Sequence, residues 1–217
     1  MAGESRFELV IFDCDGVLVD SEPIANRVLA ECLCKIGLPT TLEESYATYK
    51  SRSWSQCLEL IQGKLGRPVP EHFAADYYRR ALAAYERELE AVPGIHQVLA
   101  RITTPICVAS NGRHTTMQVT LRKTALWERF AGRIYSSMDV PRPKPFPDLY
   151  LHAAGQMGAA PARCAVVEDS PSGISAARAA GMTVFGYAGR EDPGALSAAG
   201  AQVFRAMRDL PALLGCD

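Results

Sequence analysis

The sequence has 217 residues, of which 48% are hydrophobic and 22% are charged, so the chain can bury a sizeable core. Its 23 basic and 24 acidic side chains give a net charge of −1, which argues against a general nucleic-acid binder. No stretch reaches the roughly 18 uninterrupted apolar residues of a membrane span, and the seven cysteines form no CxxC pair or zinc-type cluster. The composition predicts a cytoplasmic protein without a membrane or nucleic-acid partner. It leaves the oligomeric state open and is compatible with a monomer.

Short apolar runs bounded by polar residues recur along the chain and predict buried strands. They are Phe7–Phe12, Pro105–Ala109, Arg133–Ser136, Arg163–Val167, Met182–Tyr187 and Ala201–Phe204. Helical patterns lie between them, notably His114–Lys123, Pro147–Met157 and Pro171–Ala180. Strands that alternate with helices predict an α/β fold, with a Rossmann-like parallel sheet and helices on both faces.

The stretch 19–89 differs, because it contains no convincing buried strand. A first helix is expected from Pro23 to a stop at Gly37, a second over Ser53–Leu65 and a third over Pro70–Leu89. We therefore expect an all-helical insert at 19–89, interrupting a core formed by residues 1–18 and 90–217.

Two carboxylates, Asp13 and Asp15, follow the first predicted strand at positions i and i+2, and Gly16 allows the chain to bend there. One of them could act as a nucleophile while the other gives and takes protons. Close like charges repel unless a cation lies between them, which favours a divalent ion. An ordinary Asp-rich turn after a strand is the alternative.

The second and third polar segments also fall beyond predicted strands. Ser110–Gly112 offers a hydroxyl, an amide and backbone N–H groups for an anion, although Ser110 or Asn111 could simply cap the next helix. Lys144 lies between two prolines that restrict its direction, and an ammonium there could neutralise a phosphate. The alternatives are a solvated lysine and the competing cation Arg142.

The fourth segment, Glu168–Ser170, follows the strand that ends at Val167 and precedes a helix. Its acids could cap that helix. Paired acids at the end of a buried strand are also what Mg²⁺ needs, since it takes oxygen ligands from one or two carboxylates plus a substrate phosphate.

In their order and spacing, these segments resemble the four motifs of the haloacid dehalogenase superfamily: Asp13-x-Asp15-Gly16, Ser110-Asn111-Gly112, Lys144-Pro145 and Glu168-Asp169-Ser170. The likeness spans nearly the whole chain, and the helical insert resembles the small cap domain of that superfamily. The branch it resembles is that of β-phosphoglucomutase and the sugar-phosphate phosphatases. Segments such as Leu18–Glu22 and Ala180–Phe185 resemble the phosphatases that act on 6-phosphogluconate.

The resemblance implies a phosphoric monoester hydrolase that works through an aspartyl-phosphate. Asp13 would attack phosphorus, and Asp15 would protonate the leaving sugar oxygen and then activate water. The cofactor would be Mg²⁺. Mg²⁺ would be held by Asp13, by the carbonyl of Asp15 and by Asp169, with Glu168 supporting these ligands. The phosphoryl group would be bound by Ser110, Asn111 and Lys144. Cys14 points away from its two neighbours and is expected to be buried and inert.

Substrate choice is expected to lie in the cap. The loop 49–54, which we expect to join the first two cap helices, carries Lys50 and Arg52, and these cations would suit the carboxylate of a sugar acid such as 6-phosphogluconate. Glu22 is the third candidate for substrate contact, and a solvated charged loop is the alternative reading of the cations. Relatives often have Gly where Ser51 stands, which affects the predicted shape of this loop.

Arg113 and His114 could also face the substrate, although a His in this setting is more often a surface residue at a helix start.

Two other functions stay open. A β-phosphoglucomutase would return the phosphoryl group to the sugar. That enzyme has a His in its first cap helix that helps this transfer, whereas Ala25 stands at the position we align with it. A catalytically inactive relative that binds a ligand or partner is disfavoured by the complete set of motif residues. Dehalogenase chemistry needs no Mg²⁺, and the acids Asp15 and Asp169 speak against it.

Overall fold

The computed structural model describes residues 6–50, 52 and 54–216. The chain divides into two compact units, of which one runs to Asp20 and resumes at Glu90, and the other is Ser21–Leu89. Val19 and Asp20, which we expected in the insert, belong to the first unit. Val19 forms β-bridges to Asp15 and Ala91, and the N–H of Asp20 donates to the carbonyl of Glu90 at 3.0 Å.

The first unit contains a six-stranded parallel sheet in the order β3-β2-β1-β4-β5-β6. The six predicted strands are thereby confirmed, and the α/β fold with them. Their bounds are β1 Leu9–Phe12, β2 Ile106–Ser110, β3 Ile134–Ser136, β4 Cys164–Glu168, β5 Thr183–Tyr187 and β6 Gln202–Phe204.

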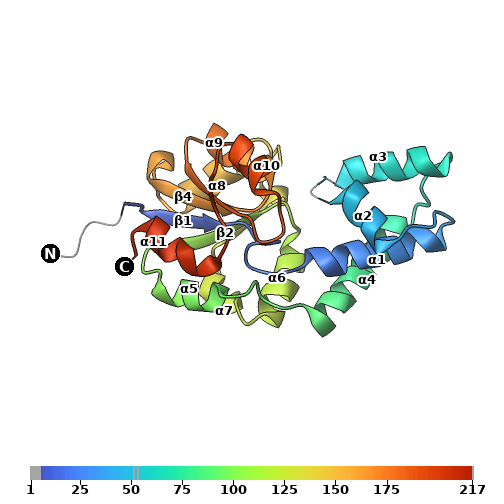
Figure 1. Ribbon diagram of the computed structural model, residues 1–217, viewed down its shortest axis with the longest axis horizontal. Helices are drawn as coiled ribbons and strands as arrows, with labels where there is room; N and C mark the ends of the chain where they lie inside the picture. Colours follow the sequence, from blue (N-terminus) through green and yellow to red (C-terminus); the bar gives the residue numbers. More distant parts are fainter. Residues whose placement is uncertain (1–5, 51, 53, 217) are drawn as a thin grey trace. The chain divides into compact units, whose positions relative to one another are not determined.

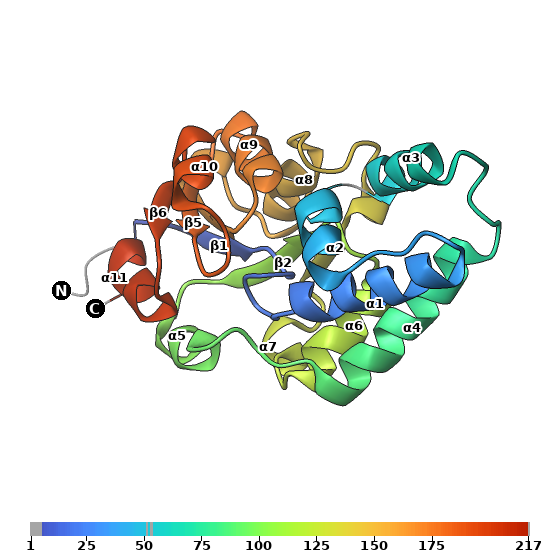
Figure 2. The same ribbon diagram turned by 45° about the vertical axis from the view of Figure 1, so that its right-hand side comes forward.

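Helices cover both faces of this sheet. Figure 1 shows α8, α9 and α10 on one face and α5, α7 and α11 on the other, and the turned view in Figure 2 agrees. The bounds are α5 Ile95–Arg101, α6 His114–Lys123, α7 Trp127–Phe130, α8 Asp148–Gln156, α9 Pro171–Ala179, α10 Pro193–Ala198 and α11 Leu210–Leu214, with short 3₁₀ turns η1 Ser137–Asp139, η2 Pro161–Arg163 and η3 Met207–Asp209.

The strand β1 lies at the centre of the sheet, and all four of its residues are buried. From it the chain continues to β2 and β3 on one side of the sheet, and then crosses to β4 on the other side. Parallel sheets bind ligands at the carboxyl ends of the strands where the strand order reverses in this way. In this protein that point lies between β1 and β4.

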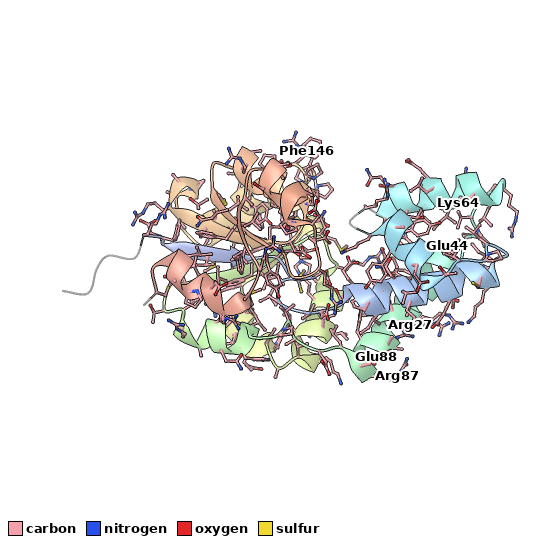
Figure 3. The ribbon with its side chains drawn as sticks, viewed as in Figure 1. Arg27, Glu44, Lys64, Arg87, Glu88 and Phe146 are labelled. Carbon is pink, nitrogen blue, oxygen red and sulfur yellow. The ribbon has the colours of Figure 1, made fainter. Side chains whose placement is uncertain are left out.

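The second unit is helical, with α1 Glu22–Lys35, α2 Leu42–Tyr49, α3 Trp54–Leu65 and α4 Phe73–Glu88. The apolar face of α1, including Val28 and Leu33, is buried. An ion pair between Arg27 and Glu88 joins α1 to α4 (Figure 3). Among the described residues, no helix of either unit is long and apolar enough to cross a membrane.

The helix α2 was not predicted, and its presence corrects one expectation. The segment between Tyr49 and Trp54 connects α2 to α3, which are the second and third helices of this unit rather than the first and second. The local reason is a capping box, in which Thr41 accepts from the N–H of Glu44 while the Glu44 side chain accepts from the N–H of Thr41. Ser51 and Ser53 lie outside the described residues.

Candidate active site

Strands β1, β2 and β4 bring their polar ends to one edge of the sheet. Asp13 follows β1 directly, Ser110 is the last residue of β2, and Glu168 is the last residue of β4. The N–H of Asp13 donates to the carbonyl of Val167 at 2.9 Å, which fixes the first carboxylate beside β4. Asp13 and Glu168, which are 155 positions apart in the sequence, therefore share one site.

Lys144 reaches this site from the loop that precedes α8. Its ammonium nitrogen lies 2.6 Å from Oδ1 of Asp13 and 2.7 Å from Oε1 of Glu168, and the side chain is buried. Burial alone would lower the pKa of Lys144, but the carboxylates of Asp13 and Glu168 raise it well above its ordinary value. The side chain is therefore a fixed ammonium at neutral pH.

The two carboxylates beside Lys144 respond differently to their surroundings. Burial raises the pKa of Asp13 from 3.8 to about 7; Lys144 opposes this rise, while Glu168 and Asp15 add to it. Burial also works against ionisation of Glu168, but Lys144 and the hydrogen bonds from Ser170 and Tyr150 hold its pKa below the ordinary value. Of these two carboxyl groups, Asp13 therefore ionises less readily than a free Asp, and Glu168 ionises more readily than a free Glu.

Glu168 is held by five hydrogen-bond donors of the protein. Oε1 accepts from Lys144 and from the hydroxyl of Tyr150 at 2.9 Å. Oε2 accepts from the N–H of Asp169 at 3.0 Å and from both the N–H and the hydroxyl of Ser170 at 2.9 Å. These donors occupy its lone pairs, so Glu168 is better suited to support a metal ligand than to act as one.

Oxygen atoms of Asp13, Glu168 and Asp169 lie within 4.8 Å of one another and could hold a metal ion. With Asp15, these side chains make four carboxylates around one lysine, which is an excess of three negative charges when all are ionised. Burial is the largest cause of the raised pKa of Asp13, and the charges of Glu168 and Asp15 add to it. A hard divalent cation such as Mg²⁺, which takes carboxylate and carbonyl oxygens, fits both the donor set and the charge.

Asp15 is half-buried and lies near the loop that follows β2. A Cβ atom added to Gly112 would be 3.7 Å from Oδ2 of Asp15 and 3.3 Å from Oγ of Ser110. The N–H of Gly112 donates to that Ser110 hydroxyl at 3.0 Å. The second carboxylate of the first motif therefore faces the predicted phosphate-binding loop.

Asn111 has a side-chain contact that the sequence did not predict. Its amide nitrogen donates to the carbonyl of Lys144 at 3.2 Å, and its amide oxygen accepts from the N–H of Lys144 at 3.0 Å. The side chain of Asn111 therefore anchors the backbone of the lysine.

Cys14 is buried, and burial raises its pKa well above the ordinary value, as expected of an inert thiol.

Two glycines leave room for the acids of this site. A Cβ atom at Gly16, where φ is +77°, would lie 1.8 Å from Oδ2 of Asp169. A Cβ atom at Gly173, in the first turn of α9, would lie 1.7 Å from Oε1 of Glu168. The sequence analysis gave Gly16 the role of a bend, and the structure adds the close approach of Asp169.

The candidate substrate residues Glu22, Lys50 and Arg52 belong to the helical unit. Glu22 accepts from the amide of Asn26 at 2.8 Å, and Arg52 donates to the carbonyl of Thr48 at 2.7 Å. The ammonium of Lys50 lies 5.8 Å from the centre of the Tyr46 ring. Burial raises the pKa of Cys57 to about 11, and the charges of Arg52 and Glu22 also act on this thiol. Their contact with a substrate stays a prediction.

His114 is the exposed first residue of α6. Its Nε2 lies 2.9 Å from the carboxylate of Asp139, so it has a partner on the surface of the first unit. Arg113 directly precedes this helix at its N-cap position. The role of both residues toward a substrate stays a prediction.

Comparison with known proteins decides the family. The haloacid dehalogenase-like hydrolase family matches residues 7–181. This chain belongs to the haloacid dehalogenase-like hydrolases. The hydrolase is 35% identical over 182 residues to 6-phosphogluconate phosphatase of Escherichia coli, covering 83% of this chain and 82% of that protein. The family resemblance and the prediction of an enzyme are confirmed.

Solved structures of relatives agree along nearly the whole hydrolase. A conserved haloacid dehalogenase-like protein of unknown function from Agrobacterium tumefaciens is 38% identical, with a TM-score of 0.85 and coverage of 96% of this chain and 98% of that one. A family hydrolase from Deinococcus radiodurans, solved with bound phosphate and sodium, is 32% identical, with a TM-score of 0.80 and coverage of 98% and 96%.

Tyr150 is the residue at this site that the sequence analysis missed. It lies in α8, it is fully buried, and its hydroxyl donates to Glu168. The pattern gave a weak signal at best, namely a phenol on the buried face of an otherwise apolar helix segment. Its contact depends on how α8 packs against the sheet, which local sequence does not encode.

Proposed function

We propose that this hydrolase is a Mg²⁺-dependent phosphatase that acts on a small phosphorylated sugar or sugar acid through an aspartyl-phosphate at Asp13. The observation that carries the proposal is the buried ammonium of Lys144, 2.6 Å from Asp13, at the acidic cluster of Asp13, Glu168 and Asp169. Phosphoryl transfer depends on this combination of a positioned nucleophile, a fixed cation and a metal site. The relative named 6-phosphogluconate phosphatase supports the same chemistry and makes 6-phosphogluconate the favoured substrate.

In this proposal Asp13 attacks phosphorus, and the bond from phosphorus to the sugar oxygen breaks. Asp15 gives its proton to that oxygen. Asp15 then takes a proton from water, whose oxygen attacks phosphorus, and the carboxylate of Asp13 is released with inorganic phosphate. Lys144 neutralises charge on the transferring group, and Ser110 and the backbone of Asn111 would bind its oxygens.

Asp13, the carbonyl of Asp15, and Asp169 would hold the Mg²⁺, and Glu168 would orient the lysine and the loop at Asp169. The ion would neutralise the excess negative charge and keep Asp13 ionised for attack. The five donors to Glu168 support this division of roles.

Release of phosphate from a panel of sugar phosphates and sugar-acid phosphates, with and without Mg²⁺, tests the proposal. We expect Asp13→Asn to lower Mg²⁺-dependent release by roughly 10⁴-fold while the protein stays folded. Asp209→Asn is the matched control, because Asp209 forms an exposed ion pair with Arg208 in the same unit; its activity should stay within about twofold of the wild type. Undiminished turnover by Asp13→Asn would refute the nucleophile.

The helical unit is proposed to act as the cap that selects the substrate. If Lys50 and Arg52 bind a sugar-acid carboxylate, their replacement by Ala should raise KM for 6-phosphogluconate about tenfold and leave KM for glucose 6-phosphate unchanged. Lys64→Ala is the matched control, since Lys64 is a cation on α3 of the same unit. Equal changes in KM for both substrates would contradict a carboxylate site at these residues.

The mutase alternative predicts a different product. Ala25, in the first turn of α1, has no group that could give or take a proton. We therefore expect release of phosphate from sugar phosphates and no isomerisation of β-glucose 1-phosphate. Isomerisation without phosphate release from any sugar phosphate would overturn the choice of a phosphatase.

A further inference from the structure

Tyr150 shares a carboxylate oxygen with the lysine of the site. Its hydroxyl lies 2.9 Å from Oε1 of Glu168, and the ammonium of Lys144 lies 2.7 Å from the same oxygen. All three side chains are nearly or fully buried. A buried hydroxyl that donates to a buried carboxylate makes a strong, charge-assisted hydrogen bond.

The ring of Tyr150 also faces the lysine directly. The ammonium of Lys144 lies 4.7 Å from the ring centre, within the range of a cation–π interaction. The ring is fixed in place because α8 packs against the sheet through neighbours such as Leu149 and Ala153, which are fully buried. Lys144 is thus bounded by an aromatic face, by Glu168 and by Asp13.

The other oxygen of Glu168 fixes the carboxylate from the opposite side. Oε2 is held by the N–H groups of Asp169 and Ser170 and by the Ser170 hydroxyl at the start of α9. Glu168 therefore cannot move to follow the lysine. The position of the ammonium between Asp13 and Glu168 depends on how strongly Oε1 attracts it.

We propose that Tyr150 is a positioning residue for the phosphatase reaction, whose hydroxyl shares Oε1 of Glu168 so that Lys144 stays close to Asp13. Without the hydroxyl, the full charge of Oε1 draws the ammonium toward Glu168 and away from the place where phosphate binds. This inference rests on the proposed function for its role in turnover. The geometry on which it depends lies wholly within the α/β unit.

Tyr150→Phe tests the inference, because it removes the hydroxyl and keeps the ring. Tyr135→Phe is the matched control, since Tyr135 is a half-buried tyrosine of β3 whose ring contacts His152. Binding of inorganic phosphate in the presence of Mg²⁺, measured by calorimetry, should weaken about tenfold in Tyr150→Phe and less than twofold in the control. Binding of Mg²⁺ alone should change less than twofold in either variant, because the hydroxyl acts through the lysine.

A double-mutant cycle with Glu168→Asp separates positioning from a general structural effect. The shorter side chain withdraws the carboxylate from the hydroxyl, so Tyr150→Phe should cost little further phosphate affinity in that background. Equal losses in both backgrounds, or a loss of Mg²⁺ affinity as large as that of phosphate, would overturn the inference. Phosphate binding needs no turnover, so an absence of activity on every sugar phosphate would count against the proposed function and leave this test intact.

Discussion

In the α/β unit the ion pairs of Lys144 with Asp13 and Glu168 are buried, whereas in the helical unit the ion pairs lie on exposed helix turns. Lys144 is shared by Asp13 and Glu168 with almost no solvent contact. In the helical unit, Arg27 pairs with Glu31 and Glu88 while more than a third of each side chain is exposed.

The difference in burial decides how much each pair contributes. Removing one partner of a buried pair leaves an uncompensated charge in a low-dielectric environment, whereas water replaces a lost surface partner. The α/β unit should therefore respond strongly to small changes at its site, and the helical unit should tolerate equivalent changes. Four comparisons of variants test this contrast, from the largest expected effect to the smallest.

Gly173→Ala should produce the largest effect, because a Cβ atom there would lie 1.7 to 2.5 Å from the carboxyl atoms of Glu168. The carboxylate must leave its five donors, so the free energy of unfolding should fall by about 3 kcal/mol. Phosphate release should fall at least tenfold, because Lys144 loses the carboxylate that holds its ammonium beside Asp13. Chemical denaturation and a phosphate-release assay measure the two effects.

Gly63→Ala is the matched control in the helical unit. Gly63 lies in α3 with nothing within 4 Å of an added Cβ atom, and alanine is the better helix former by about 1 kcal/mol. This variant should be as stable as the wild type or more so, with unchanged activity. A similar loss of stability in both variants would break the contrast between the units.

Lys144→Met should destabilise the protein by about 3 kcal/mol at pH 8, because Asp13 and Glu168 then remain buried without a cation. Arg27→Met removes an exposed cation from two carboxylates and should cost less than about 1 kcal/mol. Unfolding in denaturant under identical conditions compares the two. Equal costs would mean that burial does not set the strength of these pairs.

Asp13 gives the α/β unit a specific pH dependence when a chelator removes divalent ions. Its pKa is about 7 in the folded protein and near 3.8 in the unfolded chain, so the folded state binds the proton more tightly. The contribution of this group to stability is therefore favourable at acid pH and is lost as pH rises from about 4 to 7, by at most about 1.4 kcal/mol per pH unit.

Asp13→Asn should remove this pH dependence and be more stable than the wild type at pH 8 in the chelator. Thermal unfolding of both proteins between pH 4 and 8 provides the measurement. Added Mg²⁺ should raise the melting temperature of the wild type more than that of the variant. If the stability of the two proteins changes with pH in the same way, the pKa of Asp13 is not raised in the folded protein.

Much of the α/β unit could be predicted from the sequence because its central strands β1, β2 and β4 are buried at every position. A run such as Leu9–Phe12 is apolar at every position, and its end is marked by an abrupt change to Asp13. The short motifs after the strands identified Asp13 and Glu168, the two carboxylates that pair with Lys144. In the helical unit the apolar pattern is weaker, and α2 was missed although Thr41 and Glu44 carry the signature of a capping box.

The contacts that could not be predicted are those that join distant segments. Asn111 anchors the backbone of Lys144 across 33 positions, and Tyr150 reaches Glu168 from a helix on one face of the sheet. Neither contact follows from the spacing of residues in one element. Both depend on the packing of α8 and of the loop before it, which the whole fold determines.

Tyr49→Phe should have the smallest effect and the opposite sign. Tyr49 is buried in the helical unit, and its hydroxyl has no hydrogen-bond partner among the described residues. A buried hydroxyl without a partner costs free energy, so its removal should leave stability unchanged or raise it by up to about 1 kcal/mol. Tyr150→Phe changes the same group in the α/β unit and should lower stability, because there the hydroxyl donates to Glu168. Loss of stability in Tyr49→Phe, measured by denaturant unfolding, would show that this hydroxyl has a partner after all.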